Sequence, residues 1–220
     1  MTEAVNNQII LNDVRLARLS LTKPYIGKDA PIDPATGKPQ GKYHADLIID
    51  LMHPQLEAFK TLMREAVVRK FKDDAPAALE LIRAQDKLCL HRGDVTRAGK
   101  AEYAGKLYIS ANNDDQPTIV VTENGVNVAN RGTPTVLTPS HDSYPYAGSY
   151  ANVQLSVFAY SHPKGGKGVS AQLMGVQFLR HGQRLMGSAV SSASEFAPVK
   201  GASADSAPPT ATPTGGAGLI

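Results

Sequence analysis

The chain has 220 residues, with 23 Lys and Arg against 20 Asp and Glu, and its net charge is therefore +3. A balance this small excludes a histone-like basic protein, although it permits contact with nucleic acid. The single cysteine, Cys89, excludes an internal disulfide and a cysteine-based zinc site.

The N-terminal part of the chain is predicted to form two strands joined by a long loop. The first strand covers residues 9–21, and a loop rich in Pro, Gly and Lys covers residues 22–41. Residues 42–51 form the second strand, because apolar and polar side chains alternate there.

A helical insertion is predicted next. Pro54 stands where a helix begins, and Asp73–Asp74 ends that helix. Its apolar stripe, which we expect to lie in the core, follows helical spacing: Leu56, Phe59, Met63, Ala66 and Val67. A second, shorter helix is predicted over residues 75–85.

The rest of the folded part is predicted to be β-structure. Four strands are expected, over residues 103–111, 118–122, 148–161 and 168–181. Asn124–Gly125 indicates a tight hairpin, and residues 131–143 are predicted to be a loop. Several strands, few helices and no alternation of strands with helices favour a barrel or a sandwich.

Composition divides the chain near residue 187. Residues 1–187 are predicted to form one domain, whereas residues 188–220 are rich in Ala, Ser, Pro, Thr and Gly. Such a segment has too little apolar surface to offset its ordering entropy, so we expect a disordered C-terminal tail. No signal-peptide pattern and no membrane-spanning apolar run is found, which predicts a cytoplasmic protein with a buried, inert Cys89 thiol.

The sequence contains none of the catalytic motifs that we sought. The Gly-rich run Lys164–Gly168 lacks the spacing of a phosphate-binding loop, and the six histidines are scattered without metal-ligand spacing. We therefore expect no enzyme activity, no catalytic residue, no metal and no cofactor. A metal-dependent nuclease stays open as an alternative, since dispersed carboxylates can meet in the folded chain.

The faces of two predicted strands suggest nucleic-acid binding. In residues 150–160, one face is apolar and the other presents three aromatic rings among polar side chains, unless a helix or strand covers it. In residues 104–111, Lys106 and Tyr108 are predicted to face outward, where a ring stacks on a base and an ammonium meets a phosphate. The alternative is an ordinary exposed Lys–Tyr pair.

Several segments together resemble the phage single-stranded DNA-binding proteins. The resemblance covers residues 8–187, and its most specific parts are Tyr144–Asn152 and Gly166–Ala171. Weaker matches are found at Ala17–Ser20, Lys42–Ala45, Leu47–Ile49, Arg92–Asp94, Tyr103–Gly105, Tyr108–Ala111 and Val176–Phe178. The resemblance implies a mainly β protein with a five-stranded OB-fold barrel, in which the helical insertion follows either the second strand or a third.

The resemblance also implies a function. It predicts sequence-independent binding and protection of single-stranded DNA in phage replication, recombination and repair, in the host cytoplasm. The DNA-binding positions that it carries over are Tyr103, Lys106, Tyr108, Tyr144, Tyr146, Tyr150 and Lys167. Phage replication or recombination proteins are expected as further partners, and homo-oligomerisation is left open. The tail departs from the acidic tails common in such proteins, because its only acids are Glu195 and Asp205.

Three alternatives remain open at this point. A strand-annealing recombination protein would pair complementary strands after binding them. A structural or scaffold β protein would contact only other proteins. RNA is a further possible ligand, because stacking on a base does not read the 2′-hydroxyl.

Overall fold

The computed structural model describes residues 7–28, 30–123, 126–130, 144–163 and 165–185. All of these belong to one unit of the chain, Met1–Met186. The tail predicted for residues 188–220 and the loop predicted for residues 131–143 lie outside the described residues.

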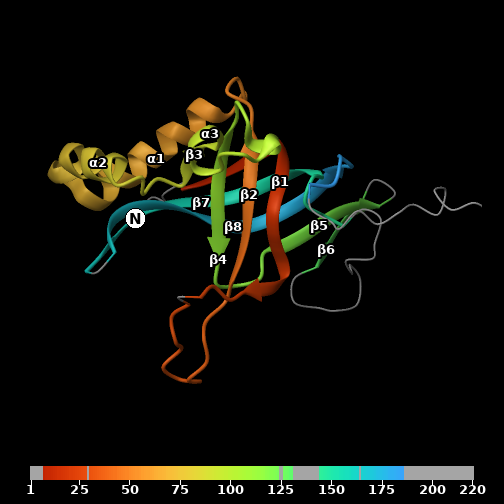
Figure 1. Cartoon of the computed structure of the whole chain (residues 1–220), viewed down its shortest axis with the longest axis horizontal. Helices are drawn as coiled ribbons and strands as arrows, with labels where there is room; N and C mark the ends of the chain where they lie inside the picture. Colours follow the sequence, from red (N-terminus) through yellow and green to blue (C-terminus); the bar gives the residue numbers. More distant parts are fainter. Residues whose placement is uncertain (1–6, 29, 124–125, 131–143, 164, 186–220) are drawn as a thin grey trace, which may run out of the picture. The chain divides into compact units, whose positions relative to one another are not determined.

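Five strands close into a barrel (Figure 1). They are β1 (Gln8–Tyr25), β2 (Lys42–Ile49), β4 (Leu107–Asn113), β7 (Tyr150–His162) and β8 (Gly166–Arg180). The antiparallel pairs are β4–β2, β2–β1, β1–β7 and β7–β8. A short parallel pairing of β4 with β8 closes the circle. The predicted mainly β OB-fold barrel is thereby confirmed.

The long strand β1 serves both halves of the barrel because it is bent. Its first half pairs with β7 and its second half with β2, with both partners meeting at Arg15. The register shifts once in the pairing with β7 and twice in the pairing with β2, and Asp13 and Arg18, at the first shift of each pairing, have φ values of 52° and 46°. These are β-bulges, which bend a strand and redirect its side chains.

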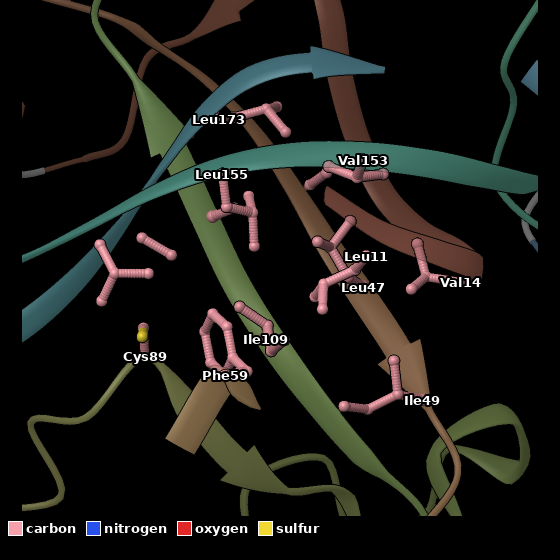
Figure 2. Packing of buried hydrophobic residues seen from close by; sticks show 14 of the residues in the cluster. Leu11, Val14, Leu47, Ile49, Phe59, Cys89, Ile109, Val153, Leu155 and Leu173 are labelled. Carbon is pink, nitrogen blue, oxygen red and sulfur yellow. The ribbon is translucent and has the colours of Figure 1, made fainter. Parts of the chain in front are cut away.

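The helical insertion follows the second barrel strand. It comprises α1 (Leu56–Phe71), the 3-10 turn η1 (Lys72–Asp74) and α2 (Ala75–Ala84). The predicted apolar stripe of α1 is buried against the strands, where Phe59 lies near Ile109 and Cys89 (Figure 2). The sequence had left the position of this insertion open, and the structure places it between β2 and β4.

The remaining elements extend the sheet at both edges. β3 (Leu90–Arg92) pairs with β4, while β5 (Thr118–Glu123) pairs with β8 and with β6 (Val126–Asn130) as the predicted hairpin. Between β3 and β4 lie α3 (Gly93–Thr96) and the 3-10 turn η2 (Ala101–Tyr103). Among the described residues, no helix is long and apolar enough to cross a bilayer.

Two predicted strand boundaries are wrong by four residues. The first strand ends at Tyr25 and not at residue 21. The strand expected from Tyr103 begins at Leu107, because the preceding residues form turns. The Lys106 amide donates to the Tyr103 carbonyl at 3.1 Å, and Gly105 has a φ of 67°, a left-handed conformation that glycine adopts readily in turns. The stretch 93–106, which we call the covering segment, therefore folds back onto the barrel.

Candidate nucleic-acid interface

Polar side chains cover the outer surface of β2 and β4. His44 and Asp46 on β2 stand opposite Asn112 and Ser110 on β4, since these residues are register partners. The alternate residues, such as Leu47 and Ile109, are fully buried in the barrel. We call this polar part of the outer surface, around residues 44–46 and 110–112, with the neighbouring end of the β7–β8 hairpin, the groove face.

A cavity of about 260 Å³ opens on the groove face. It lies where β4 diverges from β8, next to the segment that leads from α2 into β3. Its polar lining combines amide, hydroxyl, imidazole and cationic groups with one carboxylate: Asp86, Lys87, His91, Ser110, Asn112, Tyr160 and Ser170. The loop of residues 26–41 projects from the barrel between β1 and β2, at one end of this face (Figure 1).

An aromatic ring lies on the strand backbone beside the cavity. Tyr160 of β7 is the register partner of Gly168 of β8. A Cβ atom added to Gly168 would lie 2.4 Å from Cζ and from the hydroxyl oxygen of Tyr160. The ring therefore crosses the position that a side chain at residue 168 would occupy. Gly168 provides space for this ring and has no positive φ of its own.

A second ring lies at the opposite end of the groove face. Tyr25, at the end of β1, is 57% exposed and meets His44 edge-on, with ring centroids 5.5 Å apart. Burial and the neighbouring Arg18 guanidinium lower the pKa of His44. The imidazole is therefore neutral at pH 7 and can donate or accept a hydrogen bond.

A buried carboxylate lies in the floor of the groove face. Asp46 is 2% exposed, and its Oδ2 accepts hydrogen bonds from the Tyr103 hydroxyl at 2.9 Å and from Arg97 Nε and Nη2 at 3.2 and 3.1 Å. Arg18 Nη1 lies 3.6 Å from the same oxygen. The cluster holds one negative and two positive charges, so its net charge is +1.

Three of the predicted DNA-binding tyrosines are buried. Tyr103, Tyr108 and Tyr144 are 1%, 3% and 7% exposed. The prediction that Tyr108 faces solvent is wrong, because the covering segment lies over the outer side of β4. There Tyr103 meets Tyr108 edge-on at 5.2 Å, and Arg97 lies 5.0 Å from the Tyr108 ring centroid.

The other four predicted residues are partly exposed, but each already has a partner. Arg180 lies 3.5 Å from the ring centroid of Tyr150, and Arg184 lies 4.2 Å from that of Tyr146. Lys106 forms an ion pair with Asp50. The Lys167 ammonium lies 4.8 Å from the ring centroid of Phe71 at the end of α1. Their role in DNA binding remains a prediction, and the structure does not gather them into one site.

Sequence reasoning did not single out Arg18, His44 and Asp46, which converge on the groove face with Tyr25 and Tyr160. Tyr160 was noted only as one of the three rings on its strand. For Tyr160 a signal was present: in a hairpin that turns over residues 163–165, Tyr160 falls opposite Gly168, and a ring opposite glycine can lie flat. For Asp46 there was none, because a polar residue in an alternating strand predicts an exposed position.

The described residues contain no group of three or more His, Cys, Asp or Glu side chains that could hold a metal ion. Cys89 is buried as predicted, and burial raises the pKa of its thiol to about 12. Its Sγ lies 3.7 Å from the Met63 sulfur.

Known proteins resemble the chain both in sequence and in fold. Residues 7–207 match the family model of the single-stranded DNA-binding protein of Enterobacter phage Enc34. Protein p50 of Acyrthosiphon pisum secondary endosymbiont phage 1 is 31% identical over 192 residues, which span 86% of this chain and 92% of p50.

Two solved structures resemble the fold. The single-stranded DNA-binding protein of bacteriophage Enc34 in complex with single-stranded DNA gives a TM-score of 0.56 at 20% identity, covering 82% of this chain and 90% of that chain. A C-terminal truncation of the same phage protein gives a TM-score of 0.54 at 19% identity, covering 81% and 88%. At this level of identity, the likeness shows a shared barrel fold.

Proposed function

Because this chain belongs to the family of the single-stranded DNA-binding protein of Enterobacter phage Enc34, we propose that it binds single-stranded DNA irrespective of sequence. It acts as a binding protein and not as an enzyme. The relative from phage Enc34 has been solved with single-stranded DNA bound, which supports the same ligand class here.

The groove face is the proposed path of the strand. The observation that carries this assignment is the combination of a cavity, two accessible rings and a carboxylate outweighed by two guanidiniums on one face of the barrel. Two segments of the chain border the path: the loop of residues 26–41 and the β7–β8 hairpin. An open channel suits a single strand, because its unpaired bases are accessible for stacking all along the strand.

Binding would combine stacking with contacts to phosphates. Bases stack on Tyr25 and Tyr160, and stacking contributes about 1–3 kcal/mol per base for any of the four bases. Arg18 and the lysines of the neighbouring loops contact phosphates. The hydroxyl and amide groups of Ser110 and Asn112 can donate or accept hydrogen bonds, so they tolerate different bases.

We place this activity in phage DNA replication, recombination and repair, in the cytoplasm of the host. By coating exposed strands, the protein would shield them from nucleases and from re-pairing. Phage replication or recombination proteins are its proposed protein partners. The DNA-contact roles predicted for Tyr146, Tyr150, Lys106 and Lys167 belong to this proposal as additional contacts at the edge of the path.

Fluorescence anisotropy of a labelled oligo-dT of about 30 nucleotides, titrated with the protein at several salt concentrations, tests the function. We expect binding whose logarithmic affinity falls with the logarithm of salt at a slope of about −0.7 per contacted phosphate. Unlabelled oligo-dT should displace the probe, whereas an equal mass of duplex should not. A salt-independent affinity, or no binding at low salt, would contradict the proposal.

A further inference from the structure

The Asp46 cluster contains more positive charge than a buried carboxylate needs. A carboxylate with 2% exposure must be stabilised by charged or hydrogen-bonding partners, since burial of an isolated charge is highly unfavourable. Arg97 and Tyr103, both from the covering segment, already donate three hydrogen bonds to its Oδ2. Arg18 is a second cation beside the same oxygen.

The backbone at Arg18 is shaped to bring this side chain to the cluster. Arg18 has a φ of 46°, a left-handed conformation that is unfavourable for a residue with a Cβ. It lies at the bulge between Ala17 and Ser20, where the pairing of β1 with β2 shifts register. Bulges of this kind redirect side chains and occur often beside functional sites.

The two arginines differ in how they are held. Arg97 is 25% exposed, and its guanidinium lies within 6.0 Å of the ring centroids of both Tyr103 and Tyr108. The Arg18 side chain is 46% exposed, nearly twice the exposed fraction of Arg97. Arg97 is therefore packed more tightly than Arg18, but part of each side chain stays exposed to solvent.

We propose that Asp46 is a positioning residue that holds Arg18 and Arg97 as a paired site for one phosphodiester of single-stranded DNA. The proposal rests on the proposed function and adds a specific site to it. An arginine fixed by a carboxylate presents its remaining N–H donors in a set direction, and planar guanidinium groups match the geometry of phosphate oxygens.

The direction in which DNA affinity changes when the Asp46 charge is removed tests the proposal. A negative charge close to a phosphate repels it, so a carboxylate without a positioning role lowers DNA affinity, and its removal tightens binding. A carboxylate that positions two arginines has the reverse effect, and its removal weakens binding. The sign of the change in affinity therefore separates the two cases.

The test compares Asp46→Asn with Glu57→Gln in the anisotropy assay. Both changes remove one negative charge, but Glu57 is on α1, where it pairs with Lys60 at 2.7 Å. We expect Asp46→Asn to weaken binding by roughly tenfold, as expected when one charged hydrogen-bonded contact is lost. The salt slope should become shallower by about 0.7, which corresponds to one phosphate. Glu57→Gln should leave affinity and slope unchanged or raise affinity slightly.

A second pair of variants covers the case in which Asp46→Asn does not fold, as judged by thermal unfolding. Arg18→Lys keeps the charge but loses the planar group, whereas Arg69→Lys makes the same change on α1, where Arg69 pairs with Glu65 at 3.6 Å. We expect Arg18→Lys to weaken binding because the bidentate geometry is lost, whereas Arg69→Lys should match wild type.

Two results would overturn the positioning role while DNA binding by the wild-type protein stands. One is an Arg18→Lys variant that binds as tightly as wild type. The other is a folded Asp46→Asn variant that binds as tightly as wild type or more tightly. If wild-type protein does not bind, the proposed function itself fails.

Discussion

At the scale of single residues, the ring of Tyr160 makes the sharpest prediction. It crosses the strand above Gly168 on the groove face, where one side of the ring rests on backbone. We expect Tyr160→Ala to weaken oligo-dT binding by at least about fivefold, because a lost stack costs roughly 1–3 kcal/mol. Tyr150→Ala, which removes a proposed contact at the edge of the path whose ring Arg180 already covers, should weaken binding less. Equal losses for both variants would move the path toward Tyr150.

Gly168→Ala tests the same ring without removing it. The new methyl group would collide with the end of the Tyr160 side chain, which can swing away at little cost in stability. Affinity should then fall in the same direction as for Tyr160→Ala, while the melting temperature changes little. Gly168→Ala should also have a much smaller effect when Tyr160 is already alanine, because the two changes act on one contact.

At the scale of elements, the packing of the covering segment on the barrel is the most sensitive to an added side-chain atom. Gly93 begins α3, and a Cβ added there would lie 2.1 Å from the Tyr103 carbonyl oxygen and 2.9 Å from its carbonyl carbon. Because backbone cannot yield as a side chain does, Gly93→Ala should displace the segment and destabilise the protein by about 1–3 kcal/mol. Thermal or urea unfolding measures this loss.

Gly165→Ala is the control for that change. The added Cβ would meet nothing closer than 3.4 Å, and Gly165 has no positive φ. We expect its unfolding midpoint to stay within the error of the wild-type value. If Gly93→Ala were equally silent, the covering segment would not be packed on the barrel as the structure describes it.

The covering segment also marks the limit of what the sequence could predict. Alternation correctly identified the core faces of β2 and β7 and the stripe of α1, because burial on one side of a regular element leaves a periodic signal. Alternation cannot say whether the outer side faces water. Tyr108 is on that side and is nevertheless buried, since a segment without periodicity folds over it and Asp46 fixes that segment through Arg97 and Tyr103.

At the scale of the whole domain, the barrel closes at a narrow seam. β4 and β8 form only two register pairs, Ala111 with Ala171 and Asn112 with Gln172. Beyond these pairs, the segment before β3 fills the space between the strands. The Val169 amide donates to the Lys87 carbonyl and the Ser110 amide to the Cys89 carbonyl, both at 2.9 Å. The segment that leads from α2 into β3 thus completes the barrel.

Cys89 occupies this seam and reports its opening. The thiol is buried and its pKa is raised to about 12, so at pH 8 it is protonated and shielded from alkylating reagents. Cys89 shares one core cluster with α1 and all five barrel strands. We therefore expect iodoacetamide labelling at pH 8 to occur only on global unfolding, with the same dependence on denaturant as unfolding measured by circular dichroism. Ser161→Cys, an exposed position on β7, is the control that should label at once.

The same thiol predicts how stability depends on pH. Its folded pKa lies above the unfolded value of about 8.5, so its contribution is complete below that value and is lost as pH rises toward 12. The unfolding free energy should fall by about 1.4 kcal/mol per pH unit from this group above pH 9, and Cys89→Ala should remove that part of the slope. Labelling that is fast and independent of denaturant would instead mean that the seam opens locally while the rest of the barrel stays folded.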